Sequence, residues 1–277
     1  MRVFVTGASG FLGKRVVARL SNEGHDVRVL VRRPEAYQAP AGVETIIGDL
    51  EDLPTWADAL TGQDAVVHLA AIIQTWGRWK EFDRAIVAAT RELIAAADAR
   101  RVRRFVYISS EAVLQDGTPL LDIDETALPR RRPSSFYGQA KRLAEQAVLD
   151  HAGLIERIIL RPTFIWGEGS APLNDLARRA TAGRLPLFDG GRPSFEHVHV
   201  DNVALAVSLA LSGGRPGGIY LITNGEPMPV REFLAGVLAA LGAPMPRRSL
   251  PSTPLYQVAA ALEGTWRALR LPGRPPI

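Results

Sequence analysis

The sequence has no cysteine, and its only lysines are Lys14, Lys80 and Lys141. The lack of cysteine excludes disulfides, thiolate nucleophiles and cysteine-based metal sites, and it suits a reducing compartment. No run approaches the ~20 apolar residues that cross a bilayer, and the chain enters a predicted strand without a basic-then-apolar signal segment. We therefore expect a cytoplasmic protein that makes no membrane contact.

The chain also has little excess charge, with 33 Lys and Arg against 29 Asp and Glu, a formal net charge of +4. The basic residues form no stripe interleaved with aromatic residues, so we expect no nucleic-acid partner. With 277 residues, 47% of them hydrophobic, the chain can bury a large core. These bulk properties predict a folded protein whose partner is a small molecule.

A glycine-rich turn near the amino terminus is the most informative stretch. Arg2–Thr6 is apolar and β-branched, and Phe11–Glu23 has helical spacing. Gly7 and Gly10 lie between this strand and this helix, and Gly13 lies at the start of the helix. Glycines at a strand-to-helix turn allow a tight bend and a close phosphate, and the helix N-terminus faces the anion with N–H groups. The segment predicts a dinucleotide phosphate site, with an ordinary glycine-rich turn as the alternative.

Strands and helices alternate through the following part of the chain. Such alternation, with right-handed crossovers, is typical of a Rossmann-type α/β fold with a doubly wound parallel sheet, whose ligand lies at the carboxyl ends of the strands. The predicted strands are 26–32, 43–47, 65–69, 105–108 and 157–160, and the predicted helices are 54–60, 79–99 and 136–150.

The alternation loosens after Arg161, where proline and glycine become frequent. We expect a dinucleotide-binding domain over residues 1–166, to which 194–224 returns, and a smaller substrate-binding lobe of 167–193 and 225–277. Within the later segments we expect strands at 196–200 and 218–223 in the main sheet, a helix over 203–211 with Asp201 as its N-cap, and an amphipathic helix over 254–271.

A second group of residues carries candidate chemistry. Ser109 and Ser110 end a predicted strand, and Tyr137 and Lys141 are four residues apart, which places them on one face of a helix. A tyrosine of pKa ~10 is a poor acid or base at neutral pH, and a neighbouring cation would lower that pKa. A serine hydroxyl can then hold the substrate oxygen.

Together these motifs resemble the extended short-chain dehydrogenase/reductases, within the NAD-dependent epimerase/dehydratase superfamily. The sequences of residues 105–110 and 160–167 are most similar to those of the 3β-hydroxysteroid dehydrogenase branch. The sequence of residues 222–229 is similar to that of the sterol-4-carboxylate dehydrogenases of the same branch. The resemblance covers almost the whole chain and rests on 6–13, Gly48-Asp49-Leu50, His68-Leu69-Ala70-Ala71, Ser109-Ser110, Tyr137 with Lys141, Arg161-Pro162-Thr163 and 199–203.

The resemblance implies a role for each matching residue. Tyr137 would be the general acid/base, Lys141 would lower its pKa and bind the nicotinamide ribose, and Ser110 would orient the substrate, with Ser109 as the alternative. The implied cofactor-binding residues are Gly7, Ser9, Gly10, Phe11, Leu12, Gly13, Arg32, Arg33, Asp49, Leu50, Leu69, Ala70, Ala71, Ser109, Tyr137, Lys141, Pro162 and Thr163.

The chain departs from the family pattern at two positions that bear on the cofactor and on proton transfer. Ile86 replaces an asparagine found in many members, which puts an asparagine-organised water relay in doubt. The acidic residue that often ends the second strand and binds the adenosine ribose is Val31 here, followed by Arg32 and Arg33. Because guanidinium groups suit a 2′-phosphate, we predict NADP(H) over NAD(H), unless these arginines are merely solvated.

Two further departures favour a substrate of low polarity. Phe164 stands where sugar-nucleotide enzymes often place an asparagine, and Glu111-Ala112 replaces the Asp-Glu pair of the dehydratases. Trp76, Phe164 and Trp166 are candidate substrate residues, although ordinary packing explains them equally well. His197 and His199 share a strand face, but no third ligand is evident, so we predict no metal.

The leading hypothesis is an NADP(H)-dependent oxidoreductase that interconverts a secondary alcohol and a ketone on an apolar, sterol-like substrate or on a β-keto/β-hydroxy acid. One alternative is a sugar-nucleotide epimerase with tightly bound NAD. The other is a non-catalytic NADP-binding regulator, which the set Ser110, Tyr137 and Lys141 argues against. The resemblance further implies a homodimer formed through the helices 79–99 and 136–150.

Overall fold

The computed structural model describes residues 1–74, 76–128 and 131–269 of the chain. These residues form two compact units, the first made of Met1–Gly167 and Val198–Asn224, and the second of Glu168–His197 together with the segment that starts at Gly225. The returning segment thus begins at Val198, and residues 194–197 belong to the second unit. Among the helices that the structure describes, none has the length and apolar character needed to cross a membrane.

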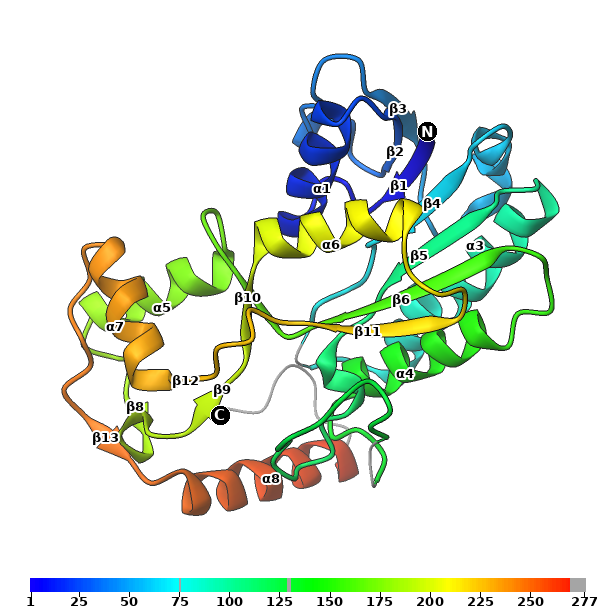
Figure 1. Cartoon of the computed structure of the whole chain (residues 1–277). Coiled ribbons are helices and arrows are strands. Elements are labelled where there is room, and N and C mark those ends of the chain that lie inside the picture. Colours follow the sequence, from blue (N-terminus) through cyan, green and yellow to red (C-terminus); the bar gives the residue numbers. More distant parts are fainter. Residues whose placement is uncertain (75, 129–130, 270–277) are drawn as a thin grey trace. The chain divides into compact units, whose positions relative to one another are not determined.

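The first unit is built on a seven-stranded sheet in which every neighbouring pair of strands is parallel (Figure 1). The strand order is β3-β2-β1-β4-β5-β6-β11, the order of a doubly wound nucleotide-binding sheet with one added strand, which confirms the predicted Rossmann-type fold. The strands are β1 (Arg2–Thr6), β2 (Asp26–Val31), β3 (Glu44–Ile47), β4 (Ala65–His68), β5 (Arg104–Ile108), β6 (Glu156–Pro162) and β11 (Gly218–Ile222).

Helices cover both faces of this sheet (Figure 1). The side chains of α1 (Phe11–Asn22) and α6 (Val200–Ser212) share one apolar core with the sheet, and those of α3 (Ala89–Ala99) and α4 (Phe136–Leu149) share another. Successive strand residues point to opposite faces, and on β1 Phe4 enters the second core while Val3 and Val5 enter the first. The buried, β-branched strands of the sequence therefore fill two layers at once.

The predicted helix over 79–99 exists, but it is not uniform. It consists of α2 (Trp79–Phe82), a π-helical segment at Asp83–Ala88, and α3. Ile86 and Val87 of the π-helical segment are buried. The predicted helix at 54–60 is instead a pair of 3₁₀ turns, Leu53–Thr55 and Ala57–Leu60.

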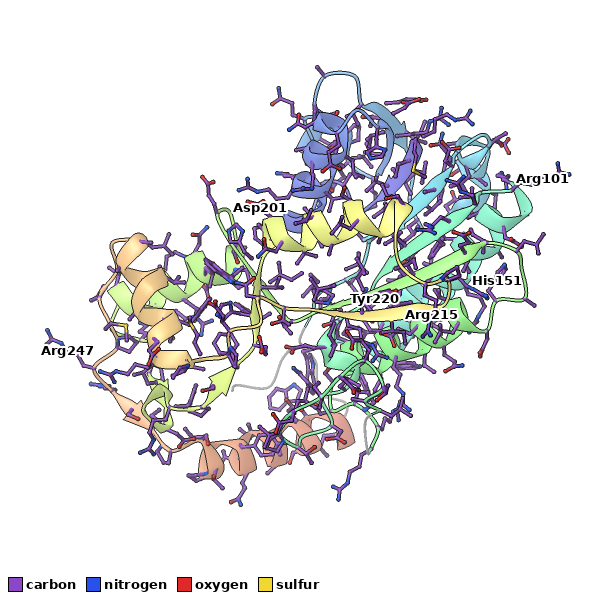
Figure 2. The ribbon with its side chains drawn as sticks, in the orientation of Figure 1. Arg101, His151, Asp201, Arg215, Tyr220 and Arg247 are labelled. Carbon is purple, nitrogen blue, oxygen red and sulfur yellow. The ribbon has the colours of Figure 1, made fainter. Side chains whose placement is uncertain are left out.

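Two local predictions are wrong. The strand predicted at 196–200 is β10 (His197–His199), which pairs with β7 (Phe164–Trp166) in a separate two-stranded sheet and not with the main sheet. Helix α6 begins at Val200, and the N-cap is His199, whose Nδ1 accepts a hydrogen bond from the Asp201 N–H at 3.3 Å. Asp201 lies inside the first turn, at the end of α6 in Figure 2, where its charge favours the helix dipole.

The second unit is smaller and less regular. The helices α5 (Ala171–Thr181) and α7 (Val230–Ala240) enclose a core whose buried members are Ala180, Leu187, Leu234 and Leu238. Helix α8 (Ser252–Ala268) replaces the helix predicted over 254–271, of which residues 270 and 271 lie outside the described residues. The remaining short elements are β8 (Leu187–Phe188), β9 (Ser194–Phe195), β12 (Met228–Pro229) and β13 (Ser249–Leu250), with 3₁₀ turns at Pro34–Ala36, Glu111–Val113 and Asp189–Gly191.

Candidate active site

The glycine turn between β1 and α1 has almost no room for side chains. A Cβ on Gly7 would lie 2.7 Å from the Ala70 nitrogen, and a Cβ on Gly13 would lie 2.1 Å from the Gly7 oxygen. Gly7 also has a φ of +77°, a conformation that glycine adopts without strain. The backbones of β1, α1 and the segment after β4 can approach one another only because these positions are glycine.

Helix α1 presents its N-terminus at this turn. Its N-cap, Gly10, makes no side-chain capping bond, and its first turn carries no acidic residue. The initial N–H groups of a helix carry a partial positive charge, and here no carboxylate of the same turn competes for them. The turn therefore fits an anionic group such as a diphosphate.

A buried hydrogen-bond network fixes the ends of β1 and β4 beside that turn. The Thr6 hydroxyl lies 2.7 Å from His68 Nδ1, and His68 Nε2 lies 3.0 Å from the Thr90 hydroxyl on α3. The Ala70 N–H donates to the Thr6 hydroxyl at 3.4 Å. Burial, and secondarily the charge of Lys141, lowers the pKa of His68 to about 3, so the imidazole is neutral.

Arg32 and Asp49 come together at the carboxyl ends of β2 and β3. Arg32 Nη1 lies 3.7 Å from Asp49 Oδ2, and Arg33 follows as an exposed residue. The Asp49 carbonyl accepts a hydrogen bond of 2.7 Å from the Trp56 indole, and Leu50 is half-buried beside it. The side chain of Arg32 is 67% exposed.

Tyr137 lies in the first turn of α4, next to the loop that follows β5. Burial raises the pKa of Tyr137 to about 12, and a hydrogen bond with the Ser110 side chain opposes that rise. The neighbouring Gly138 makes this approach possible, because a Cβ there would lie 2.4 Å from the Ala112 oxygen. Ser110 also accepts a bond of 3.2 Å from the Ala112 N–H, which fixes its side chain.

Lys141 lies one helical turn further along α4 and is buried. Its Nζ donates to the Ile108 oxygen at 2.7 Å, and it lies 4.8 Å from the centre of the Tyr107 ring and 6.0 Å from that of Tyr137. Burial lowers the pKa of Lys141 to about 7, with Glu145 acting in the opposite direction. The lysine can therefore exchange a proton near neutral pH.

Burial acts on the pKa of Tyr137 in the direction opposite to the effect expected of Lys141. We expected Lys141 to lower the pKa of Tyr137, whereas burial raises it. Desolvation disfavours a phenolate, and the same desolvation leaves Lys141 only partly protonated at neutral pH. The three residues are nevertheless close together. Ser110 follows the carboxyl end of β5, and Tyr137 and Lys141 lie on the side of α4 that faces the sheet.

The remaining predicted residues lie around these groups. Leu69, Ala70 and Ala71 follow β4, Ser9 is exposed in the glycine turn, and Phe11 and Leu12 open α1. Pro162 ends β6, and the Thr163 N–H donates to the Ile222 oxygen at 3.0 Å. The Ser109 hydroxyl is buried and makes no hydrogen bond with any residue that the structure describes.

The aromatic candidates come from two separate segments. Trp76 is half-buried in the segment after β4, whereas Phe164 and Trp166 lie on β7. Trp166 meets the His199 ring edge-on, with centroids 4.9 Å apart. Within the described residues, no group of three or more His, Cys, Asp or Glu side chains could hold a metal ion.

The sequence reasoning missed one buried charge pair. Glu145 of α4 and Arg161 of β6 form two hydrogen bonds, and their side chains are 4% and 5% exposed. The signal was available, because Glu145 follows Lys141 by four residues and so extends the helix face of Tyr137 and Lys141. A glutamate on a buried helix face indicates a buried cationic partner.

The parallel sheet, the glycine turn and the Tyr137–Lys141 helix together define the extended short-chain dehydrogenase/reductase class. A model of the NAD dependent epimerase/dehydratase family matches residues 3–223. The chain belongs to this family, and it is an enzyme of the short-chain dehydrogenase/reductase type.

Curated relatives agree with the branch predicted from the sequence. A 4-hydroxy-2-methyl-3-oxo-4-farnesyl-3,4-dihydroquinoline-1-oxide ketoreductase of Stigmatella aurantiaca is 38% identical over 100% of this chain and 84% of its own length. A 2-alkyl-3-oxoalkanoate reductase of Stenotrophomonas maltophilia is 36% identical over 100% and 87%. A 3-beta-hydroxysteroid dehydrogenase of Mycolicibacterium neoaurum is 32% identical over 88% and 71%.

Solved structures share the fold. The structure of MoeE5 in complex with UDP-glucuronic acid and NAD has a TM-score of 0.77 and 28% identity, with 91% of this chain and 86% of that chain covered. The Thermus thermophilus UDP-glucose 4-epimerase, solved as a complex with NAD, has a TM-score of 0.75 and 26% identity, with 91% and 86% covered.

Proposed function

We propose that this protein is an NADP(H)-dependent oxidoreductase that interconverts a secondary alcohol and a ketone, with Tyr137 as its general acid/base. The observation that carries the proposal is the placement of Ser110, Tyr137 and Lys141 at the carboxyl ends of the strands, where the glycine turn also lies. A dinucleotide-dependent reduction requires an anion-binding turn and a proton-transfer group at the same end of the strands.

Each residue of the site has a task that follows from its surroundings. The N-terminus of α1 binds the diphosphate, and the Ser109 hydroxyl and Thr163 lie at strand ends where they can bind the rest of the dinucleotide. The bound nicotinamide supplies or accepts a hydride. Tyr137 donates a proton to the carbonyl oxygen in the reductive direction, and the Ser110 hydroxyl orients that oxygen.

Lys141 supports the proton transfer from its buried position. Its pKa of about 7 allows it to gain and lose a proton near neutral pH, and its donation to the Ile108 oxygen holds its amine in place. Lys141 can therefore supply a proton to replace the one that leaves Tyr137. The raised pKa of Tyr137 keeps the phenol protonated at neutral pH, which suits the reductive direction.

The names of the relatives narrow the substrate. Two of them are named as reductases of compounds with a 3-oxo group and a long apolar substituent, a farnesyl group in one and an alkyl chain in the other. This chemistry agrees with the apolar residues Phe164 and Trp166 on β7. We therefore place a 2-alkyl-3-oxo acid, or a related β-keto compound, first among the substrate classes and a 3-keto steroid second.

A sugar-nucleotide epimerase remains the second candidate, because the solved relatives named above include one. Such an enzyme would carry tightly bound NAD and would interconvert epimers without added cofactor. Mass spectrometry of the denatured, purified protein checks this alternative. Recovery of stoichiometric NAD, together with epimerisation of a UDP-sugar, would favour it over the reductase.

Replacement of Tyr137 by phenylalanine tests the proposal. We expect turnover of NADPH with a 2-alkyl-3-oxo acid to fall ~10²–10⁴-fold, while NADPH binding, measured by fluorescence, stays within about twofold of wild type. The matched control is Tyr220→Phe, which removes a phenol that accepts a hydrogen bond from the Arg215 N–H at 2.7 Å near β11 (Figure 2). Near-wild-type turnover in Tyr137→Phe would overturn the proposed role.

A further inference from the structure

A buried ion pair joins the helix of Tyr137 and Lys141 to strand β6. Arg161 Nε donates to Glu145 Oε1 at 2.9 Å, and Arg161 Nη2 donates to Glu145 Oε2 at 2.7 Å. Both side chains are almost completely buried. Removing two charges from water is costly, and such a pair is often no more stable than apolar residues of the same volume, so stability alone is a weak reason for its presence.

The glutamate of the pair lies on the same face of α4 as the proposed proton-transfer residues. Tyr137, Lys141 and Glu145 are spaced at four-residue intervals on α4, so one helix face carries a phenol, an amine and a carboxylate in succession. Arg161 directly precedes Pro162 and Thr163, the residues expected at the nicotinamide end of the cofactor. The ion pair therefore connects the two chain segments that must be in register for hydride and proton transfer.

The surroundings of the Lys141 amine give the carboxylate a specific effect. From α4 it faces Tyr137 and Glu145, from β5 Tyr107 and the Ile108 oxygen, and from β4 His68. Neither tyrosine is ionised at neutral pH, because burial raises both pKa values, and His68 is neutral. The carboxylate of Glu145 therefore offsets the burial of a charged Lys141.

Arg161 determines how that carboxylate acts. Both oxygens of Glu145 are occupied by the guanidinium, while the Lys141 amine donates to the Ile108 oxygen instead. The bidentate contact thus keeps Glu145 at a fixed place and leaves the amine beneath Tyr137. A carboxylate without this partner would be free to form a direct ion pair with Lys141 and to draw it away from the phenol.

We propose that Glu145 and Arg161 are positioning residues, which hold a carboxylate one helical turn from Lys141 and fix α4 against the end of β6. Their effect reaches the reaction through Lys141, and neither side chain contacts the substrate. The inference rests on the proposed role of Lys141 in proton transfer. It predicts that loss of the Glu145 charge changes the protonation of Lys141 even when the fold is intact.

The scarcity of lysine makes this prediction directly measurable. The chain has three lysines, so protein labelled with ¹³C at lysine Cε gives three resonances, and Lys141→Arg identifies that of Lys141. We expect its titration midpoint in the cofactor-free protein to fall by about one pH unit or more in Glu145→Gln, a tenfold loss of proton affinity. An unchanged midpoint in a folded Glu145→Gln variant would overturn the inference.

A matched control lies at the opposite end of the same strand. Arg104 Nε of β5 donates to Glu156 Oε2 of β6 at 2.8 Å, so Glu156→Gln also removes the acid of an Arg–Glu pair that includes a β6 residue. We expect Glu156→Gln to leave both the Lys141 midpoint and the pH profile of turnover unchanged. An equal shift in both variants would show a general effect of lost negative charge and would contradict the inference.

A double variant separates positioning from a purely structural role. Glu145→Met with Arg161→Met replaces both charges by apolar side chains of similar size, an exchange that buried ion pairs often tolerate. We expect its unfolding midpoint to stay close to wild type and its Lys141 midpoint to fall less than in Glu145→Gln, because the opposing charge of Arg161 is lost as well; turnover should fall because α4 is no longer fixed against β6. A stable double variant with wild-type turnover and pH profile would contradict the positioning role and leave only a structural one.

The two proposals fail in distinguishable ways. The Lys141 titration needs neither cofactor nor substrate, so it tests Glu145 and Arg161 even if no ketone is ever reduced. If the midpoint shifts as expected but Tyr137→Phe retains wild-type turnover, the proposed function falls and the electrostatic link stands. If Tyr137→Phe is inactive and the Lys141 midpoint does not move in Glu145→Gln, the proposed function stands and the inference about Glu145 and Arg161 falls.

Discussion

The two ends of the parallel strands carry different kinds of polar groups. At the amino ends the charges satisfy one another: Arg2 lies 3.7 Å from Asp64, and Arg104 pairs with Glu156 while also donating to backbone carbonyls. Asp98 accepts hydrogen bonds from two backbone N–H groups and lies 3.3 Å from His151, a residue labelled in Figure 2. These groups stabilise the fold and leave little for a ligand.

At the carboxyl ends the polar groups are of a different kind. Helix α1 begins without a side-chain cap, and Ser109 Oγ has no hydrogen-bond partner in the described part of the chain. Tyr137 and Lys141 both have pKa values displaced by burial. Buried ionisable groups with perturbed pKa values are typical of functional sites, and this difference between the ends supports the proposed site.

The largest expected effect at the carboxyl ends is that of Gly13→Ala. A Cβ at Gly13 would meet the Gly7 oxygen at 2.1 Å and the Ala8 Cα at 2.8 Å, so α1 must move away from the turn. We expect NADPH affinity to fall ~100-fold or more, with a loss of ~1–3 kcal/mol of stability from overpacking. Isothermal titration and thermal unfolding measure the two quantities.

The control for that substitution is Gly236→Ala, in the middle of α7. Beyond the adjoining turns of α7, a Cβ there would have no atom of the described residues within 4 Å, and the helix gains ~0.5–1 kcal/mol from the exchange of glycine for alanine. We expect unchanged NADPH affinity and a slightly higher unfolding midpoint. Wild-type affinity in Gly13→Ala would contradict the assignment of the turn as the diphosphate site.

A smaller effect is expected from Gly138→Ala. The added Cβ would lie 2.4 Å from the Ala112 oxygen, which separates the start of α4 from the loop of Ser110. Because displacement of a reacting group by ~1 Å can cost ~100-fold in rate, we expect kcat to fall between ~10-fold and ~100-fold. The KM for NADPH should change less than about threefold, and steady-state kinetics that show the reverse pattern would contradict this geometry.

The buried His68 predicts a loss of stability in acid. Its pKa is about 3 in the folded protein, whereas an unfolded chain protonates histidine near 6.5, so below that pH the unfolded state binds a proton that the folded state does not. Stability should fall as the pH decreases from about 6.5 toward 3, with a slope of at most ~1.4 kcal/mol per pH unit from this group. In His68→Asn that part of the slope, followed by urea unfolding, should disappear; an identical acid slope would show that His68 is not its source.

The smallest expected effect concerns the choice of cofactor. Arg32→Ser removes an exposed guanidinium beside Asp49, and we expect the KM for NADPH to rise ~10-fold while that for NADH changes little. Arg101→Ser, at the amino ends of the strands (Figure 2), is the control and should alter neither value. Equal or better use of NADH by the wild-type enzyme would remove the predicted preference for NADP(H).

Local patterns were sufficient to predict much of this structure. The order of strands and helices follows from residue periodicity, and the glycine spacing indicates the turn before α1. The four-residue spacing of Tyr137 and Lys141 places them on one helix face. Each of these features depends on residues close together in the sequence, where side-chain type constrains the backbone directly.

Features that depend on distant residues were not predictable in the same way. The pairing of β10 with β7, the capping of α6 by His199 and the identity of Arg161 as the partner of Glu145 all depend on which segments pack together. The effect of burial on the pKa of Tyr137 was not predicted, for the same reason. A charge four residues away is visible in the sequence, whereas the extent of burial, which decides the pKa here, is a property of the fold.

Transfer of deuterium from NADPH that carries two deuterium atoms at C4 to a 2-alkyl-3-oxo acid tests the central claim most directly. We expect the wild-type enzyme to form a 3-hydroxy acid that carries one deuterium at C3, Tyr220→Phe to do the same, and Tyr137→Phe to form ~1% as much or less. Product without deuterium at C3, or equal deuterium incorporation by Tyr137→Phe, would contradict the account of Tyr137 as the acid/base of an alcohol–ketone oxidoreductase.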